Sequence, residues 1–177
     1  MAEQTPLYII ASPRPRVGKT LLARLLIEFF RHSNRPLVAY DLNPREPSLA
    51  GRFPDLTWTV DIADTRGQMA LFDQLIAGDS IARVIDLGYG PFDQFFAVMG
   101  EIGFVSEARR RLIEPIVLYL TDRAPATVRA YAGLRQKLET TTFVPVHNEA
   151  VSATFDKEDY PPSRRECRLI RIPRLSP

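Results

Sequence analysis

The sequence contains few of the residues that build disulfides or metal clusters. Its 177 residues include one cysteine, Cys167, and two histidines, His32 and His147. A single cysteine excludes an internal disulfide, and neither histidine has a second histidine or cysteine at the spacing of a metal site. We expect no disulfide framework and no histidine metal centre, and we interpret Cys167 as a residue at the edge of a strand.

Long apolar runs are also missing. No run approaches the roughly 20 residues that cross a bilayer, and residues 1–6 lack the charged start and apolar stretch of a secretory signal. We therefore expect a cytoplasmic protein without a transmembrane segment. Hydrophobic residues make up 45% and charged residues 25% of the chain, which is typical of a protein with a core, and the length fits a single domain over residues 1–177.

The net charge is small as well. The 23 basic and 21 acidic residues leave +2, which is too little to indicate nucleic-acid binding by itself. Two groups of arginines form candidate basic patches: residues 109–111, and Arg164, Arg165, Arg168, Arg171 and Arg174. Each group has two interpretations, a patch that holds DNA without sequence preference and a solvated charged face.

Short apolar runs alternate with segments of helical periodicity along the chain. The runs predicted as strands are 7–11, 36–40, 57–62, 80–86, 115–120, 143–146 and 168–172. Apolar spacings of three and four predict helices over 18–32, 67–76, 92–111 and 126–138. Residues 152–165 are predicted as an irregular surface segment. This alternation predicts an α/β fold, a parallel sheet with helices on both faces.

Residues 12–20, Ser-Pro-Arg-Pro-Arg-Val-Gly-Lys-Thr, match the end of the phosphate-binding pattern Gly-x-x-x-x-Gly-Lys-Ser/Thr. In that loop backbone amides and the lysine hold phosphate, and the hydroxyl binds magnesium. Gly18, Lys19 and Thr20 occupy the last three positions. A predicted buried strand precedes them and an amphipathic helix follows, so that a positive helix terminus faces the anion. The sequence therefore predicts a fold like that of P-loop NTPases.

The first part of the loop departs from the pattern. Pro13 stands at the first glycine position, and Pro13 and Pro15 each remove an amide donor. Arg14 and Arg16 are candidates for guanidinium contacts with phosphate, and ordinary solvated loop charges are the alternative. A further alternative for residues 18–20 is that they only begin a helix.

These residues resemble the ParA/MinD family of ATPases, whose deviant loop reads Lys-Gly-Gly-x-Gly-Lys-Thr. Arg14 stands where the family has its signature lysine, Pro15 and Arg16 replace two glycines, and Val17 fits the variable position. The family lysine reaches across a nucleotide-sandwich homodimer to the partner's phosphates. The resemblance thus implies that ATP contacts Arg14, Arg16, Val17 and the three residues that follow.

The resemblance continues in residues 41–49, which are similar to the family's switch segment Asp-x-Asp-Pro-Gln with Ser-Leu nearby. Asn43 replaces the second aspartate, which in the family positions the attacking water, so slow or absent hydrolysis is implied. Asp86 matches the Walker B aspartate that holds magnesium, with a turn cap as the alternative. By this resemblance Lys19 and Asn43 are the catalytic candidates, and Thr20, Asp41 and Asp86 the magnesium candidates.

Two later segments extend the resemblance. Residues 144–148 are similar to a family strand ending in an asparagine that hydrogen-bonds adenine, and 172–173 are similar to an Ile-Pro that flanks the base. Asn148 and Pro173 are the implied base contacts, and a turn residue after a strand is the alternative for Asn148. The similarity spans residues 7–173, whereas full members continue through further helices, so the sequence leaves open whether it is a shortened form or a fragment.

Three functions follow as hypotheses. The leading one is a ParA/MinD-like protein that binds ATP with Mg²⁺, dimerises and acts as a switch or scaffold, for example in partitioning, with weak hydrolysis and a protein partner. The second is a small-molecule ligase or kinase resembling dethiobiotin synthetase, whose loop Gly-Thr-x-Thr-x-Val-Gly-Lys-Thr aligns with the same residues. The third is a pseudo-ATPase interaction module, because Pro13, Pro15 and Asn43 each remove a functional group.

Overall fold

One sheet organises the computed structural model, which describes residues 4–162 and 168–174. In the described residues the strands have the order β3-β2-β4-β1-β5-β6-β7, and every pairing is parallel. The strands are β1 (Thr5–Ala11), β2 (Leu37–Asp41), β3 (Thr57–Thr59), β4 (Ala82–Asp86), β5 (Ile113–Thr121), β6 (Thr142–Asn148) and β7 (Ile170–Ile172). The predicted α/β fold with a parallel sheet is confirmed.

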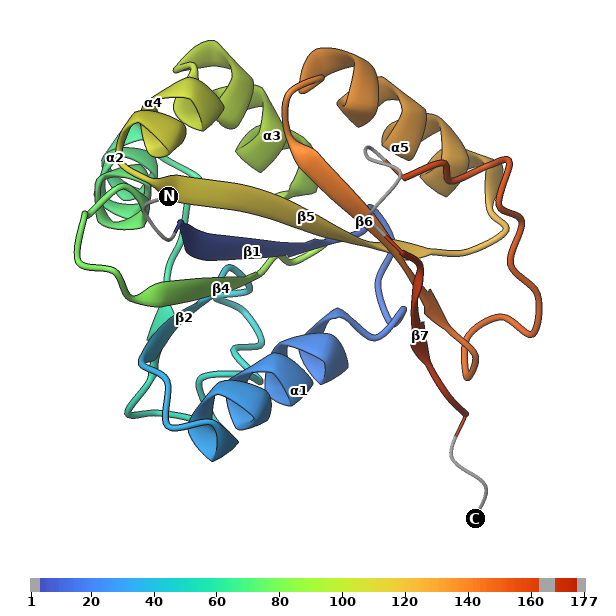
Figure 1. The fold of residues 1–177 in the computed structure, drawn as a ribbon, viewed down its shortest axis with the longest axis horizontal. Helices are drawn as coiled ribbons and strands as arrows, with labels where there is room; N and C mark the ends of the chain where they lie inside the picture. The colour runs from blue at the N-terminus through green and yellow to red at the C-terminus, as the bar shows by residue number, and fades with distance from the viewer. Residues whose placement is uncertain (1–3, 163–167, 175–177) are drawn as a thin grey trace.

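Helices cover both faces of the sheet, in unequal number. The described helices are α1 (Lys19–His32), α2 (Thr65–Leu75), α3 (Phe92–Glu101), α4 (Phe104–Arg110) and α5 (Pro125–Lys137). Figure 1 shows α1 on one side of the sheet and α3, α4 and α5 on the other. Helix α2 belongs with the larger group, because Leu71, Phe72 and Leu75 join the same apolar cluster.

Alternate residues of each strand enter two separate apolar clusters. In β1, Ile9 faces the cluster under α2 to α5, whereas Ile10 faces the smaller cluster under α1. In β4, Ile85 likewise faces the cluster under α2 to α5, and Val84 faces the cluster under α1. A parallel strand that is buried on both faces has a continuous apolar sequence. The central strands could therefore be predicted from the sequence.

Two predicted elements differ from the structure. The helix expected over residues 92–111 is broken at Gly103, which has φ +62° and separates α3 from α4, because a left-handed residue ends a helix. The strand expected over residues 57–62 ends at Thr59. Its continuation turns at Asp61, whose Oδ1 accepts a hydrogen bond from the Ala63 amide at 2.9 Å. Asp64 then caps α2 through the Gly67 amide at 2.8 Å.

The segment predicted as irregular, residues 152–165, is irregular over its described part, 152–162, but it is not confined to the surface. Tyr160 is buried, and its hydroxyl donates a hydrogen bond to the Asp122 carbonyl at 2.6 Å. Phe155 packs against the His147 ring at 5.6 Å between centroids. The segment therefore packs against the carboxyl ends of β5 and β6. Residues 163–165 and Cys167 lie outside the described residues.

Candidate nucleotide site

The loop of residues 12–18 joins β1 to α1 at the carboxyl edge of the sheet, where open α/β sheets bind ligands. Parallel register brings the predicted acidic residues to the same place. Asp86 pairs with Asp41 of β2 on one side and with Ile10 of β1 on the other. The strand ends thus place the loop and both carboxylates together.

Two residues of the loop have left-handed backbone conformations, which also occur in anion-binding nests. Gly18 has φ +103°, and Arg16 has φ +59° although it is not glycine. Holding an arginine in the left-handed region costs about 1–2 kcal/mol, so the rest of the fold imposes this shape. Successive amides in such a turn point into a concavity that binds anions. The loop thus has two left-handed residues, and its binding of phosphate stays a prediction.

Lys19 lies folded over this loop. Its Nζ donates hydrogen bonds to the carbonyl oxygens of Arg14 at 2.6 Å and Ser12 at 3.3 Å. Burial lowers the pKa of Lys19 to about 8, and the nearby Asp86 carboxylate opposes this shift. The ammonium group is thus held at the loop by two of the loop's own carbonyl oxygens.

Thr20 and Asp86 form the second half of the site. The Thr20 hydroxyl donates a hydrogen bond to Asp86 Oδ2 at 2.7 Å. Burial raises the pKa of Asp86 to about 6; Asp41 acts in the same direction, while Thr20, Lys19 and Arg24 lower it. A hydroxyl and a carboxylate side by side are oxygen ligands of the kind that Mg²⁺ prefers, so the residues present fit a magnesium nucleotide.

Asp41 organises the loop that follows β2. Its Oδ1 accepts from the Asn43 amide at 3.1 Å, and its Oδ2 accepts from the amides of Leu49 and Ala50 at 2.9 and 3.4 Å. Desolvation raises the pKa of Asp41, and these amide bonds oppose the rise. Asn43 Nδ2 donates to the Glu46 carbonyl at 3.0 Å. Asp41 therefore holds residues 42–50 in shape, and its role as a metal ligand stays a prediction.

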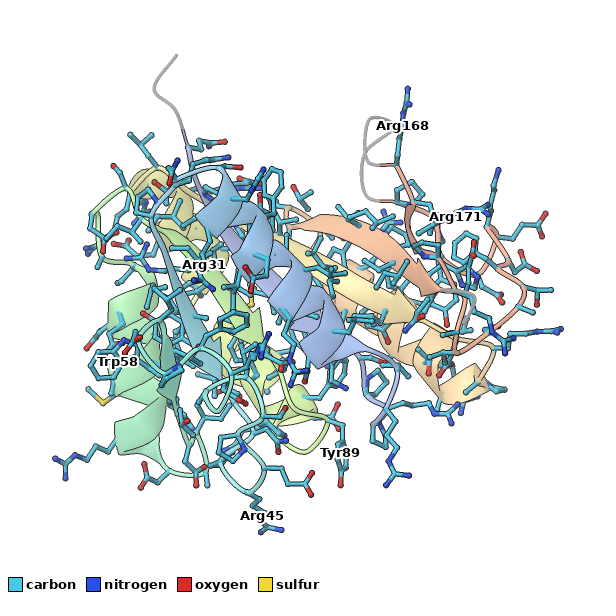
Figure 2. The ribbon with its side chains drawn as sticks, turned by 90° about the horizontal axis from the view of Figure 1, so that it is seen from below. Arg31, Arg45, Trp58, Tyr89, Arg168 and Arg171 are labelled. Carbon is cyan, nitrogen blue, oxygen red and sulfur yellow. The ribbon has the colours of Figure 1, made fainter. Side chains whose placement is uncertain are left out.

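A cavity of about 680 Å³ opens at these residues. It is lined by Pro15, Arg16, Gly18, Lys19, Thr20, Leu21, Asn43, Glu46, Asp86, Gly88 and Tyr89. A second cavity of about 590 Å³ shares Asn43 and Tyr89 with the first. Figure 2 shows Tyr89 and Arg45 projecting at the same end of the molecule, where these cavities lie. Six residues of the predicted set thus line one cavity.

Arg14 is not among the lining residues, and it pairs with Asp122, which was not predicted from the sequence. Its Nη1 lies 3.1 Å from Asp122 Oδ2, in an ion pair without the alignment of a good hydrogen bond. Asp122 is buried and follows β5 directly. The missed signal was its place after an apolar run, the same pattern that singled out Asp41 and Asp86. The guanidinium is thus bound within its own chain.

Asn148 and Pro173 are not part of the lining. Asn148 is buried; its Nδ2 donates to the Val17 carbonyl at 3.1 Å, and its Oδ1 accepts from the Ala150 amide at 3.1 Å. A Cβ added to Gly18 would lie 2.4 Å from Asn148 Nδ2. Asn148 therefore braces the phosphate loop from β6. Pro173 is exposed after β7, and both adenine contacts stay predictions.

The arginines of residues 109–111 are engaged within the fold. Arg109 pairs with Glu114 at 2.9 Å, and Arg110 and Arg111 pair with Glu107 at 3.5 and 2.8 Å. These pairs favour a solvated charged face. In the second group, Arg171 lies 3.8 Å from Glu149, and Arg164 and Arg165 lie outside the described residues.

Known proteins resemble the chain in structure. The MinD cell division protein of Aquifex aeolicus matches with a TM-score of 0.55 and 13% sequence identity, over 88% of this chain and 76% of that one. The chain has the fold of MinD. The expected P-loop NTPase-like fold is thereby confirmed, as a distant likeness in structure. No family model and no curated protein matches the sequence. Within the described residues, no helix of the MinD-like fold is both long and apolar enough to cross a membrane.

Proposed function

We propose that this protein binds ATP with Mg²⁺ in the cavity at the end of β1 and acts as a nucleotide-responsive switch or scaffold. The observation that carries the proposal is the Thr20–Asp86 hydrogen bond of 2.7 Å beside Lys19, at a loop with the left-handed residues of an anion nest. The MinD-like fold supports it, because open parallel α/β sheets bind ligands at the carboxyl edge, where this loop lies.

Each residue has a defined part in this proposal. Lys19 holds phosphate oxygens, and Thr20 and Asp86 hold Mg²⁺, which neutralises phosphate charge when bound. Arg16 supplies a guanidinium where Pro13 and Pro15 lack amides. The loop of residues 42–50, tied to Asp41, lies beside the phosphates and is the element that senses them.

Weak hydrolysis belongs to the same proposal. Asn43 lines the cavity, and an amide cannot accept a proton from an attacking water. The Asn43→Asp variant restores a carboxylate at this position. Phosphate release that appears only in the variant supports a degenerate ATPase, whereas release from neither protein favours a binding module.

The proposal includes dimerisation, which depends on the position of Arg14. The signature-lysine position is occupied by Arg14, whose guanidinium pairs with Asp122 of its own chain. A homodimer that uses this arginine requires the pair to open. Sedimentation velocity with and without ATP and Mg²⁺ measures whether nucleotide changes the oligomeric state.

The deciding experiment is calorimetric titration with ATP, once with Mg²⁺ and once with a chelator. We expect binding that requires Mg²⁺ and that Lys19→Ala weakens by roughly 10- to 100-fold, as expected for charge-assisted hydrogen bonds. The matched control is Lys137→Ala, an exposed lysine at the end of α5. If the wild-type protein binds no ATP, the nucleotide proposal is wrong and the interaction module is favoured.

A second candidate function is favoured by the adjoining cavity. Its volume of about 590 Å³ suits a small molecule, and it shares Asn43 and Tyr89 with the phosphate cavity. A ligase or kinase resembling dethiobiotin synthetase needs such a second substrate site. A screen of small carboxylic acids and amines coupled to ADP release tests this candidate.

A further inference from the structure

The two faces of the sheet are covered very differently. Helices α2, α3, α4 and α5 pack on one face, whereas α1 is the only described helix whose side chains enter the cluster on the other. Figure 2 views this second face, with α1 lying across it in front of the strands. Parallel sheets normally have both faces covered by helices. In the described residues, helices therefore cover the second face of the sheet less fully than the first.

Apolar side chains are exposed along α1 itself. Leu21, Leu25 and Phe29 are 45%, 50% and 58% exposed, and their spacing of four residues places them on one side of the helix. Its opposite side, with Ala23 and Ile27, is fully buried against the sheet. A helix that is apolar on two sides is typical of one that is buried on both.

The strands continue this apolar surface. Tyr8, Ile116 and Val144 pack on the α1 cluster and remain partly exposed, although they belong to three adjacent strands. Ile170 of the edge strand β7 is 38% exposed. We call Leu21, Leu25 and Phe29 with these strand residues the α1 face. An exposed apolar surface that spans several elements marks an interaction site.

Positive charge borders the α1 face. Arg35 follows α1 and lies 4.7 Å from the Phe30 ring centroid, and Arg168 and Arg174 flank β7. Among the described residues, no ion pair is recorded for these three arginines. The nearby carboxylates Glu28 and Glu149 are matched by Arg31 at 3.5 Å and Arg171 at 3.8 Å. The border therefore has surplus positive charge.

We propose that the α1 face binds an amphipathic helix of a partner protein, with apolar residues against Leu25 and Phe29 and acidic residues toward the bordering arginines. A helix is the element that completes a layer on a parallel sheet, and the border charge selects acidic flanks. The face begins at Leu21, which also lines the phosphate cavity. A bound helix thus lies beside the nucleotide site, although the proposal does not depend on nucleotide binding.

The test uses two synthetic helical peptides with leucine on one face, one with glutamate and one with lysine on the other. Fluorescence anisotropy of the labelled peptides measures binding to the full chain. We expect the glutamate peptide to bind, and the lysine peptide to bind at least roughly tenfold more weakly. This comparison uses the wild-type protein alone, so it does not depend on the folding of any variant.

Variants then locate the site. We expect the double variant Leu25→Glu with Phe29→Glu to bind the glutamate peptide about tenfold more weakly or worse, because it lacks the apolar anchor residues. Met69→Glu is the matched control, since Met69 is 62% exposed on α2, outside the α1 face, and it leaves binding unchanged. Circular dichroism shows whether each variant is folded.

Three outcomes overturn the proposal. The first is that the glutamate peptide does not bind, or binds no better than the lysine peptide. The second is that the wild-type chain self-associates in sedimentation velocity and that Leu25→Glu with Phe29→Glu makes it monomeric, because the occupant is then a second copy. The third is that phosphatidylglycerol vesicles bind the wild-type chain but not this variant, because the occupant is then a lipid surface.

Discussion

The two halves of the loop, residues 17–20 and residues 13–16, differ in the groups that they present. Residues 17–20 keep a left-handed glycine, a buried lysine and a hydroxyl bonded to a carboxylate. Residues 13–16 include two prolines, which have no amide donor, and two arginines. The comparison teaches that a loop can hold one backbone shape although prolines and arginines fill part of its motif, because neighbouring elements such as Asn148 support the shape.

The largest expected effect concerns residues 17–20. Gly18→Ala forces a side chain into a residue with φ +103° and places its Cβ 2.4 Å from Asn148 Nδ2. We expect a loss of about 1–3 kcal/mol in the free energy of unfolding, from backbone strain and displacement of Asn148. Urea denaturation measures it. The control Gly133→Ala, in α5 with open space around it, is neutral or stabilising, and an equal loss in both variants contradicts the prediction.

The next effect is the pH dependence of the Thr20–Asp86 pair. Because the pKa of Asp86 is raised to about 6, Mg²⁺-dependent ATP affinity is full above that pH and falls as the carboxyl is protonated, by roughly tenfold per unit well below it. Calorimetric titration from pH 8 to pH 5 measures this loss. A profile that stays flat through pH 5 is inconsistent with Asp86 as the magnesium residue.

The same raised pKa makes the stability of the folded chain change with pH in the opposite direction to ATP affinity. The folded chain binds the Asp86 proton more tightly than the unfolded chain, so this contribution to stability is present below the ordinary aspartate pKa of 3.8 and is lost as pH rises through about 6. The free energy of unfolding of the wild type relative to Asp86→Asn should therefore fall between these values. A relative stability that rises over that window argues against the shift.

A smaller effect separates the two interpretations of Arg16. Arg16→Gly relieves a left-handed arginine, so the free energy of unfolding changes by at most about +1 kcal/mol after the entropy of glycine is included. If the guanidinium contacts phosphate, ATP binding weakens roughly tenfold. Leu112→Gly is matched in backbone, with φ +60°, and lies outside the site. Unchanged ATP affinity in Arg16→Gly identifies a solvated loop charge.

The smallest effect concerns the Arg14–Asp122 pair. Arg14 is half exposed, so solvent screens the 3.1 Å contact, and a double-mutant cycle of Arg14→Gln and Asp122→Asn should give less than about 1 kcal/mol. Asp159→Asn, an exposed residue in the nearby segment, is the control. A coupling energy well above about 1 kcal/mol contradicts the prediction, because it indicates a pair that solvent does not screen.

Much of the fold could be predicted because local and global signals agree in it. Buried parallel strands are apolar on both faces, and α1 repeats its apolar residues at helical spacing. The break between α3 and α4 at Gly103 could not be predicted, because the apolar spacing continues across it into α4. The burial of Tyr160 was hidden because the surrounding segment is polar and rich in proline.

The candidate site was predictable where a motif or a strand end marked it. Lys19, Thr20 and Asp86 carry such local signals, and the structure brings them into one cavity. Other contacts of the loop depend on the order of the strands in the sheet. Asp122, for example, contacts Arg14 only because β5 pairs with β1. No spacing within the sequence encodes which strands become neighbours.

The hydrogen bond from Asn148 to the Val17 carbonyl joins residues 131 positions apart. Strand β6 lies two places from β1 in the sheet, so the brace of the phosphate loop comes from a part of the chain that the ribosome makes much later. A nascent chain that has reached β5 already contains every residue of the loop but not the amide that supports it. We therefore expect the loop to reach its final form only late in synthesis, and protease protection of the loop in stalled chains should begin only after β6 has emerged.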